Sequence, residues 1–535
     1  MARFILSAIA FLLILSGSSQ VLARDMVEVI DVKSYHINLD LSNFTKHIVG
    51  KTRISFVMKV PSKNISFDFH SPNKPKEGMR VTNAFMGEPI SWKHEDHKIL
   101  LSKDTEFEKG QEYQLIIEYQ GLPVDGLIIS KNQHKDHTAF GDNWPNRAHH
   151  WFPCTDHPAD KATVEFVATY PKKYRLVANG NLISDSVQSR NTRHCHWKSS
   201  TVLPTKVMVI GLAEFAVSDP CITHGIEVNS WVFNQQQQDG FHDYAPACNI
   251  LSWYIEKLGS YPFEKLANVQ SKTRYGGMEN ASCIFYYEAS VNGEQGVNNL
   301  IAHEIAHQWF GNSVSEMDWE HIWLSEGFAT YLTNLYILEH DGKEAFKAQM
   351  LRDREKVLGF HKRYKAPVVD TLVPDLNMLL NPNSYQKGAW VLHMLRQEVG
   401  DSTFWQGLRV YYEWNKLGNA TTNDFKEAME RVSGKDLTAF FQQWLYTQGH
   451  PLLKVNWKKK KDGTVEIELI QQQEELFQIE VAIVLKGEEF ENGKLVRVEK
   501  RKTTVSIEAP GENFVVNIDP EVNLMFELDG SSEKK

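Results

Sequence analysis

The sequence predicts a multidomain α+β protein, with an all-β domain first, a mainly helical domain second and a small β-sandwich last. Two changes in apolar periodicity support this prediction. Alternation gives way to helical spacing near residue 241, and it returns after Pro451. The chain of 535 residues is 42% hydrophobic and 23% charged, which is an ordinary globular composition and enough for three or four domains.

Residues 1–23 have the pattern of a secretory signal peptide. Arg3 supplies positive charge, residues 4–15 form an apolar run, and residues 21–23 end it with the V-x-A form of a cleavage site. We therefore expect cleavage near Ala23 and export to the periplasm or the extracellular space. The run is shorter than the roughly 20 apolar residues of a membrane-spanning helix, so no stable membrane association is expected. Retention as an uncleaved anchor stays open.

Residues 24–235 are expected to form an N-terminal β-sheet domain. Apolar and polar residues alternate in residues 35–41, 54–60 and 113–119, as they do in half-buried strands. Turn-forming residues separate these runs. The glutamine run at residues 235–238 is a polar boundary before the next domain.

Residues 241–450 are expected to form the mainly helical domain. Segments with apolar residues at helical spacing are 244–258, 296–312, 325–340, 343–358, 384–399, 403–416 and 422–432. Ser325 is expected to cap the helix that begins beside it, because serine is a favoured N-cap residue. That start places Glu326 in the first helical turn, where the helix dipole favours an acid.

Residues 451–529 return to strands and predict the β-sandwich, and residues 530–535 form a polar tail. The predicted strands are 452–457, 465–471, 477–485, 503–507 and 514–518. Asp462-Gly463 is a hairpin-turn pair, so the basic run at 458–461 is interpreted as a solvated hairpin tip. With a net charge of −9, the chain has no signature of a nucleic-acid partner.

The cysteines are scattered without C-x-x-C spacing, so they indicate no metal site of their own. They are Cys154, Cys195, Cys221, Cys248 and Cys283. An odd number in an exported protein leaves at least one thiol unpaired or shared between chains. Cys195 and Cys221 are a candidate pair across neighbouring strands.

The string HEIAH at residues 303–307 has the spacing of a metal site. His303 and His307 are four residues apart, so both imidazoles lie on one face of a helix, one turn apart. Glu304 is offset and can reach a water on the metal. Glu326 follows after eighteen further residues, and two histidines with one carboxylate are the ligands of a catalytic zinc. The competing interpretation is a surface helix with two solvated histidines, but the apolar residues around the motif indicate a packed helix.

The string GGMEN at residues 276–280 precedes the proposed zinc helix. Gly276 and Gly277 let the backbone approach a ligand closely, and Met278 adds apolar surface. Glu279 is an acid that can bind an ammonium group, such as the amino terminus of a peptide. Alone, the string fits equally well a turn followed by a strand at 281–287. Beside a zinc site, the functional interpretation is favoured.

Four motifs together resemble the aminopeptidase N family of zinc metallopeptidases, the gluzincin aminopeptidases, which also contains leukotriene hydrolase. They are GGMEN, HEIAHQWFGN, WLSEGFATYL and SYQKGAW, in the order and spacing of the family. The resemblance runs from about residue 30 to the end and includes the FPCTDHP segment. It implies a saddle-shaped N-terminal sheet, a thermolysin-like catalytic domain and one Zn²⁺ per chain. It also implies a short form without the family's C-terminal helical domain, hence a more open site or one closed by a partner subunit.

The resemblance implies a role for each residue that matches a motif. His303, His307 and Glu326 match the zinc ligands. Glu304 matches the general base that takes a proton from zinc-bound water, and Glu279 matches the acid that holds the α-amino group of the substrate.

Further matches concern the peptide and the oxyanion. Gly276 and Gly277, with Met278 beside them, match the backbone that lines the bound peptide. Tyr385 matches the phenol that stabilises the oxyanion. From this sequence alone, Tyr385 would be read as a core or loop tyrosine.

Two positions depart from the family pattern. In many relatives a glutamine nine residues before the proline of FPCTDHP helps to bind the substrate amine, and this chain has Trp144 there. Asp142 and Asn143 are candidate replacements. At the position of His321 the family often has an acid, whereas leukotriene hydrolase-like members carry histidine, as this chain does. His321 either orients a zinc ligand or is a satisfied polar residue.

The leading functional prediction is an exported zinc aminopeptidase that acts on peptides with a free amino terminus. A thermolysin-like zinc endopeptidase is the main alternative, which GGMEN disfavours. Epoxide hydrolysis, as in leukotriene hydrolase, has no residue signature in the sequence. A non-catalytic peptide-binding protein is a third class, which the complete set of matched residues disfavours. The oligomeric state is not predicted.

Overall fold

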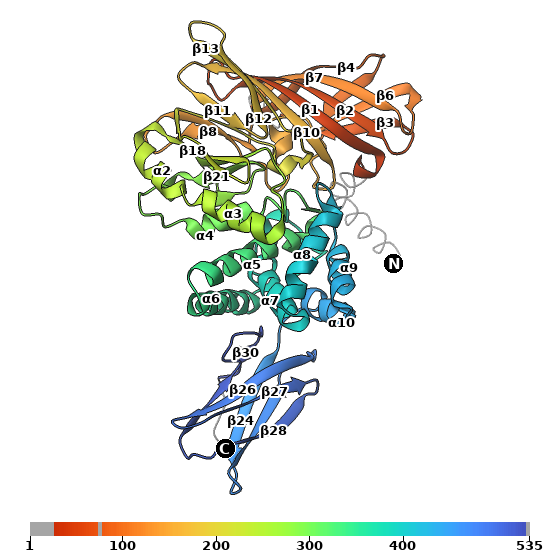
Figure 1. Cartoon of the computed structure of the whole chain (residues 1–535). Coiled ribbons are helices and arrows are strands. Elements are labelled where there is room, and N and C mark those ends of the chain that lie inside the picture. The colour runs from red at the N-terminus through yellow and green to blue at the C-terminus, as the bar shows by residue number, and fades with distance from the viewer. Residues whose placement is uncertain (1–25, 73–76, 531–535) are drawn as a thin grey trace, which may run out of the picture. The chain divides into compact units, whose positions relative to one another are not determined.

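A computed structural model describes residues 26–72 and 77–530 (Figure 1). The expected signal peptide and the end of the predicted polar tail lie outside these ranges. The chain divides into two compact units. The first contains residues up to Asp318 and residues 415–420, and the second contains residues 319–414 and those from Thr421 onward. The predicted domain limits near residues 235–241 and at 450 stay predictions.

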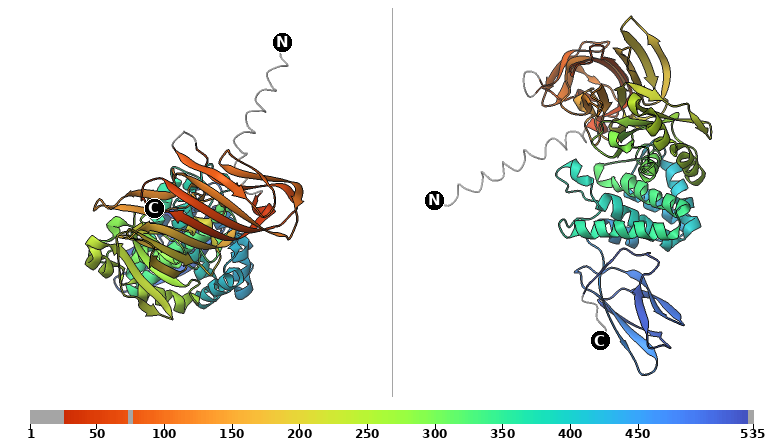
Figure 2. Two further views of the ribbon diagram at one scale, coloured as in Figure 1. Left: turned by 90° about the horizontal axis from the view of Figure 1, so that it is seen from above. Right: turned by 90° about the vertical axis from the view of Figure 1, so that its left-hand side faces the viewer.

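The first unit is built on an eight-stranded sheet in the order β12-β13-β10-β1-β2-β7-β4, with β14 paired to β10. Its strands are β1 (Ile30–Asp40), β2 (Ile48–Met58), β4 (Gly78–Phe85), β7 (Glu112–Leu122), β10 (Lys161–Pro171), β12 (Asn181–Val187), β13 (Thr192–Lys198) and β14 (Leu203–Pro204). They form one broad, twisted layer, drawn in red to yellow (Figure 2). Burial alternates along β1, β2 and β10, because one face packs on the core and the other meets solvent.

Two smaller sheets complete the β-rich N-terminal region. One has the order β3-β6-β5 and the other β11-β15-β9-β8. Their strands are β3 (Ser62–Asp68), β5 (Ser91–Glu95), β6 (Lys98–Phe107), β8 (Leu127–Lys131), β9 (His137–Gly141), β11 (Arg175–Ala178) and β15 (Ile210–Ala213). The all-β character predicted for this part of the chain is therefore confirmed.

A six-stranded sheet connects the N-terminal strands to the first helices, in the order β16-β18-β19-β21-β20 with β17 on β18. Its strands are β16 (Phe215–Val217), β17 (Cys221–Thr223), β18 (Ile226–Phe233), β19 (Lys265–Ser271), β20 (Gly277–Met278) and β21 (Cys283–Tyr287). Strand β19 is buried along its whole length and runs parallel to both neighbours, as expected for a strand covered on both faces. Strand β20 carries the GGMEN string.

Helices α2 (Gln237–Tyr244), α3 (Ala247–Leu258) and α4 (Asn298–Ala306) follow in the first unit. Helix α4 is shorter than the predicted 296–312. The backbone reverses after Ala306, and the amides of Asn312 and Val314 donate to the carbonyls of His307 and Trp309. Gly311 takes a φ of +121° in this reversal, a conformation that favours glycine.

The second unit begins with helices. They are α5 (Trp323–His340), α6 (Lys343–His361), α7 (Gly388–Val399), α8 (Asp401–Asn415), α9 (Thr422–Ser433) and α10 (Thr438–Phe441), and the π-helical turn η7 (Asn383–Lys387) directly precedes α7. The predicted helical character of this region is confirmed.

The prediction that Ser325 caps its helix is wrong. Helix α5 begins at Trp323 after the 3₁₀ turn η5 (Trp319–His321), so Ser325 already lies inside it and is buried. Glu326 nevertheless occupies the first turn, as predicted.

The second unit ends in two small sheets, β28-β25-β24-β30 and β27-β26-β29. Their strands are β24 (Leu452–Lys459), β25 (Thr464–Gln471), β26 (Ile479–Gly487), β27 (Glu491–Val498), β28 (Lys502–Glu508), β29 (Phe514–Ile518) and β30 (Glu527–Leu528). Strand β27 was not predicted, because most of its residues are polar and exposed. The sheets, shown in blue in Figure 1, follow the helices in the chain.

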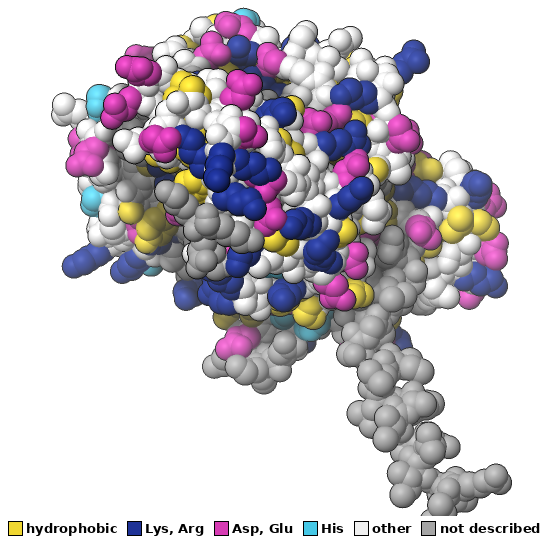
Figure 3. All heavy atoms as spheres, turned by 90° about the horizontal axis from the view of Figure 1, so that it is seen from below, with side chains coloured by type: hydrophobic (Ala, Val, Ile, Leu, Met, Phe, Trp, Pro, Cys, Tyr) yellow, Lys and Arg dark blue, Asp and Glu magenta, His cyan; other side chains and the backbone are white. Residues whose placement is uncertain are grey.

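The basic run at 458–461 lies at the predicted hairpin between β24 and β25, where Gly463 takes a φ of +84°. Lys458 and Lys460 pair with Glu466, and Lys459 pairs with Glu512. The surface view likewise shows basic and acidic side chains interspersed (Figure 3). These pairs support the interpretation of a solvated hairpin.

The cysteine pairing proposed from the sequence is wrong. Cys221 on β17 forms a disulfide with Cys248 on α3, whereas Cys195 is a buried free thiol on β13. Strand β17 pairs with β18, and α3 packs on β17, so the fold brings Cys221 to the helix rather than to β13.

Within the described residues, no helix has the length and apolar character that crossing a membrane requires.

Candidate metal and peptide site

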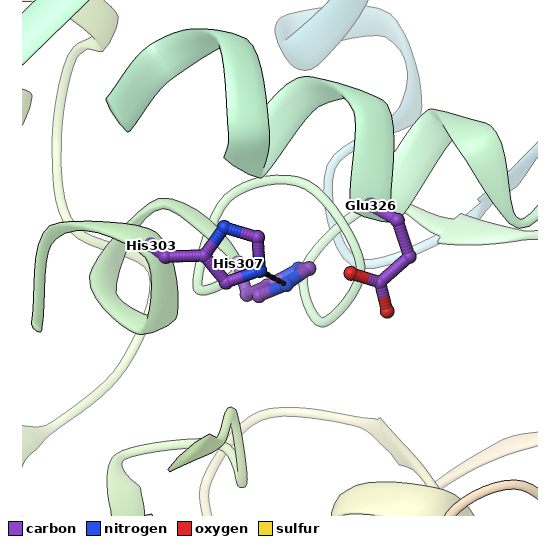
Figure 4. Close-up of side chains that lie close together, drawn as sticks. All are labelled: His303, His307 and Glu326. Carbon is purple, nitrogen blue, oxygen red and sulfur yellow. Dashed lines mark hydrogen bonds between the residues drawn. The ribbon is translucent and has the colours of Figure 1, made fainter. Parts of the chain in front are cut away.

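His303 lies in the last turn of α4, and His307 is the C-cap residue that follows the helix. Their Nε2 atoms are 3.1 Å apart, and their rings are nearly perpendicular, at 85°. Together with Glu326 of α5 they offer three ligand atoms that all lie within 4.8 Å of one another. The close-up shows the Glu326 carboxylate beside the two imidazoles (Figure 4). The structure thus brings together the three predicted ligands.

The protonation of His307 is set by its backbone contact. Its Nδ1 lies 3.1 Å from the carbonyl oxygen of Phe310, which can only accept, so Nδ1 carries the proton and donates it. This leaves Nε2 as a lone-pair donor directed at the shared point. The ring is 1% exposed. A second partner of this kind holds most metal-binding histidines in one orientation.

This donor set fits zinc. Two imidazoles and one carboxylate suit its preference for nitrogen and oxygen ligands and leave a fourth position open. Two nitrogens on one tetrahedral zinc lie about 3.3 Å apart, given Zn–N bonds of about 2.0–2.1 Å. The observed separation of 3.1 Å between the Nε2 atoms matches this value.

Glu304 is held against strand β20. Its side chain is 4% exposed. A Cβ atom on Gly277 would lie 2.2 Å from its Oε1, so only glycine at this position leaves the carboxylate in place. The neighbouring Gly276 differs, because a Cβ there would meet nothing closer than Leu300 at 4.0 Å. The GGMEN backbone and the predicted general base are therefore in direct contact.

Glu279 is fastened to the segment that follows α4. Its backbone carbonyl accepts hydrogen bonds from the side chains of Gln308, at 2.8 Å, and Asn312, at 2.6 Å. The Glu279 side chain is 5% exposed, and its neighbour Met278 is also buried. GGMEN and the segment that follows α4 are thus joined by hydrogen bonds. Sequence reasoning gave Gln308 and Asn312 no role, although both lie in the string HEIAHQWFGN.

A buried tyrosine borders the GGMEN strand. Tyr286 pairs with Gly277 across β20 and β21. Burial first, and then the negative charge of Glu304, raise the pKa of Tyr286 well above its ordinary value. Its hydroxyl stays protonated and donates to Asn268, so Tyr286 is a structural neighbour of Glu304.

The candidate replacements for the family glutamine are occupied within the fold. The fully buried Asp142 accepts from Arg147 through Oδ1, and from Thr273 and the amide of Arg274 through Oδ2. Asn143 donates to two backbone carbonyls and accepts from the Trp151 indole. Both side chains are fully buried, so neither is exposed to a substrate in this structure. That one of them replaces the family glutamine stays a prediction.

Tyr385 lies in the π-helical turn η7, in the same unit as Glu326, and its side chain is half-buried. The turn continues into α7, which packs on α5. Gly388 and Gly327 form the contact, since a Cβ on either would come within 3.0 Å of the other's backbone. Gly327 follows Glu326 directly, and Gly388 lies three residues after Tyr385. The contact between the two glycines therefore helps to fix the position of Tyr385 relative to Glu326, a predicted metal ligand.

His321 hydrogen-bonds the hydroxyl of Thr422 through Nδ1, at 3.0 Å. The same hydroxyl accepts from the Trp323 indole at the start of α5, at 2.9 Å. His321 therefore belongs to the contacts that fix the beginning of the helix that carries Glu326.

Comparison with known proteins agrees with this site. The Peptidase M1 N-terminal domain matches residues 32–207, and the Peptidase family M1 domain matches residues 244–444. The chain belongs to peptidase family M1. The second match contains every predicted catalytic and metal-binding residue.

Individual relatives share about a quarter of their aligned residues with this chain. Aminopeptidase M1-A of Oryza sativa subsp. japonica is 26% identical over 460 residues, which cover 82% of this chain and 50% of the relative. Glutamyl aminopeptidase of Rattus norvegicus is 26% identical over 384 residues, 65% of this chain and 39% of the relative. Aminopeptidase A of Gloydius brevicauda is 28% identical over 372 residues, 64% and 38% respectively. The chain spans half the length, or less, of these relatives.

Proposed function

We propose that this protein is a zinc aminopeptidase that removes the first residue of peptides. One observation carries the proposal: the ligand atoms of His303, His307 and Glu326 converge within 4.8 Å, while Glu304 lies against Gly277 of the GGMEN strand. A metal centre, a general base and a peptide-binding strand are thus combined. Family membership supports the same conclusion.

Each residue has a distinct chemical task. His303, His307 and Glu326 hold the metal, and bound zinc supplies Lewis acidity that brings the pKa of water to about 7. Glu304 accepts the proton of the attacking water and passes it to the leaving amine. The Tyr385 hydroxyl donates a hydrogen bond to the oxygen on which negative charge develops, which stabilises the transition state more than the ground state.

Glu279 determines which bond is cut. A buried carboxylate binds the α-ammonium group of the peptide strongly, because the interaction is both charged and desolvated. The peptide bond one residue further along is then presented to Glu304. Gly276, Gly277 and Met278 provide the surface along which the substrate lies. An endopeptidase of the thermolysin type has no need of such an anchor.

Cleavage of matched peptides tests this proposal. A peptide with a free amino terminus is expected to lose its first residue, and its N-acetylated analogue is expected to be inert. Glu279→Gln is expected to lower kcat/KM on the free peptide by about 10- to 100-fold, the value of a hydrogen bond between charged groups, without changing the zinc content. The exposed Glu294→Gln serves as the matched control.

Equal cleavage of the free and the acetylated peptide would instead establish an endopeptidase. A Glu279→Gln variant as active as the wild type would show that Glu279 does not anchor the α-ammonium group of the substrate. The same assay across neutral and acidic first residues would define the preference, since two of the relatives are named glutamyl aminopeptidase and aminopeptidase A.

We also propose that the protein is exported. The signal-like pattern of residues 1–23 supports this, as does the Cys221–Cys248 disulfide, because such bonds persist in oxidising compartments. Mass spectrometry of the secreted protein is expected to find a mature chain that starts near Arg24. An intact Met1 would contradict this proposal.

The domain architecture forms part of the proposal. We interpret the two C-terminal sheets as a β-sandwich and the region around α4 to α9 as a thermolysin-like catalytic domain. Limited proteolysis is expected to cut first near the largely exposed residues 235–239, where two predicted domains join, and to spare residue 450, which is buried. Resistance at 235–239 would contradict the first boundary.

A further inference from the structure

Lys387 is a buried lysine in the turn that carries Tyr385. Its side chain is 2% exposed, and its Nζ donates a hydrogen bond of 2.8 Å to the carbonyl oxygen of Gly449. Among the described residues, no carboxylate forms an ion pair with it. Burial alone lowers the pKa of Lys387 to about 8. The Lys387 ammonium is therefore stabilised by a hydrogen bond to one neutral acceptor, the carbonyl of Gly449.

Such an arrangement is costly for a residue that only fills space. Removing an ammonium from water without a counter-charge destabilises the folded state. A methionine or leucine of similar volume would pack there without this penalty. The hydrogen bond to Gly449 is thus the specific contribution of Lys387.

Gly449 is itself held firmly where the chain enters the C-terminal sheets. Its Cα lies beside His361 of α6, because a Cβ there would be 3.4 Å from the imidazole Cε1. The next residue, His450, packs on His361 with ring centroids 4.7 Å apart and hydrogen-bonds Glu527 of β30 at 3.3 Å. Strand β24 begins two residues later and pairs with β30.

The opposite side of the turn is held by α5. Gly388, next to Lys387, touches Gly327, and a Cβ on Gly327 would also lie 3.1 Å from the carbonyl oxygen of Ser384. Tyr385 is thus placed between two fixed points. One is the helix that carries Glu326, and the other is the Lys387–Gly449 hydrogen bond.

A second contact fastens the C-terminal segment to the same helices. His393 of α7 lies 3.0 Å from the hydroxyl of Tyr331 of α5 and 3.1 Å from the carbonyl of Val522. The C-terminal segment therefore contacts α7 directly and is linked to α5 through His393.

We propose that Lys387 is a positioning residue that acts through Tyr385, and that the C-terminal sheets hold the catalytic phenol in place through the Lys387–Gly449 hydrogen bond. This inference rests on the proposed role of Tyr385 as the oxyanion donor. It adds a function for the C-terminal sheets, which contribute no predicted catalytic residue.

A double-mutant cycle with Lys387→Met and Tyr385→Phe tests the inference. Lys387→Met is expected to lower kcat by about 10²-fold, the effect of misplacing a catalytic group by about 1 Å. KM and zinc content are expected to stay within twofold of the wild type. In the Tyr385→Phe background the same substitution is expected to lower kcat by less than twofold, because the phenol that it positions is already absent.

Controls separate positioning from general destabilisation. Lys365→Met, at an exposed site in the same unit, is expected to leave kcat unchanged. Lys387→Arg keeps a donor and is expected to recover part of the lost kcat. If Lys387→Met does not fold, Lys387→Leu, which also lacks a donor and has a similar volume, replaces it in the cycle with the same expectation.

Two results would be decisive against the proposals. Equal losses of kcat in the wild-type and Tyr385→Phe backgrounds would overturn the inference, because Lys387 would then act on the whole fold. Full activity of Tyr385→Phe alone would instead overturn the catalytic role of Tyr385. The failure of the inference and that of the proposed function are therefore distinguishable.

Discussion

At the scale of single residues, the site depends on close packing around Glu304. Its Oε1 occupies the space where a side chain on residue 277 would begin, so Gly277 contributes by having none. The adjacent Gly276 has open space around it. Two neighbouring glycines that look equivalent in the sequence therefore have different roles.

Alanine substitutions at these two glycines test the distinction. Gly277→Ala is expected to displace the Glu304 carboxylate and lower kcat by about 10²-fold, since a shift of about 1 Å suffices for such a loss. Zinc content is expected to be unchanged, because the nearest atoms to a Cβ on residue 277 belong to Glu304, which is not one of the three proposed ligands. The measurement is steady-state kinetics together with metal analysis.

Gly276→Ala is the matched control and is expected to retain kcat within a few-fold. Similar losses at both positions would show that backbone flexibility, rather than contact with Glu304, is what the glycines provide.

At the scale of elements, the spacing of His303 and His307 was sufficient to predict a metal-binding helix, because four residues make about one turn. Its end was not predictable. Apolar residues continue at helical spacing through Trp309 and Phe310, but these side chains are buried in a backbone reversal. Apolar periodicity shows only which residues are buried, and residues are buried both in a helix and in a backbone reversal.

Other local features could not be derived for similar reasons. Ser325 has the chemistry of an N-cap, but the preceding 3₁₀ turn starts the helix two residues earlier. Cys221 pairs with a cysteine on a helix, and such a contact depends on tertiary packing. The π-helical turn around Tyr385 leaves no pattern in a single sequence, so the role of this residue came from family resemblance alone.

The contact between α5 and α7 yields a prediction about stability. Gly388→Ala is expected to destabilise the second unit by about 1–3 kcal/mol, because the new methyl group meets the backbone of Gly327 in a packed interface. Thermal unfolding monitored by circular dichroism measures the effect. An unchanged melting temperature would show that the helices can separate without cost.

Gly359→Ala, in the last turn of α6, provides the comparison. No atom lies within 4 Å of a Cβ at this position. Alanine is the better helix former by about 1 kcal/mol, so this variant is expected to be slightly more stable than the wild type.

At the scale of the whole molecule, the first unit contains a stack of histidines outside the candidate site. The ring of His70 stacks on His97 at 4.2 Å and on His150 at 4.4 Å. Burial, and then the charge of His97, lower the pKa of His70 to about 4. Burial, and then His149, lower that of His150 to about 2.

His149 shifts in the other direction. Burial lowers its pKa, but the hydrogen bond and charge of Asp156 outweigh burial and raise it overall. Asp125 also favours a proton on His70, but less than burial and the neighbouring imidazoles oppose it.

These shifts predict that acid destabilises the first unit. His70 and His150 bind protons near pH 6.5 when unfolded, but only near pH 4 and pH 2 when folded. The unfolded state therefore binds more protons below about pH 6.5, and stability falls as the pH is lowered through that value. The melting temperature is expected to drop by several degrees between pH 7 and pH 5.

His70→Phe keeps an aromatic ring in the stack and removes one proton site, so the drop is expected to be smaller. His47→Asn, at an exposed position, is expected to keep the wild-type drop. An equal drop in His70→Phe would assign the acid sensitivity to other groups.

The central claim is that one zinc ion, held by His303, His307 and Glu326, is required for peptide cleavage. The most direct measurement is metal content against activity during a chelator titration of the purified protein. We predict one zinc per chain at the start, with activity falling in proportion to zinc and returning when zinc is added. Full activity in protein that holds less than about one tenth of its zinc would contradict the account.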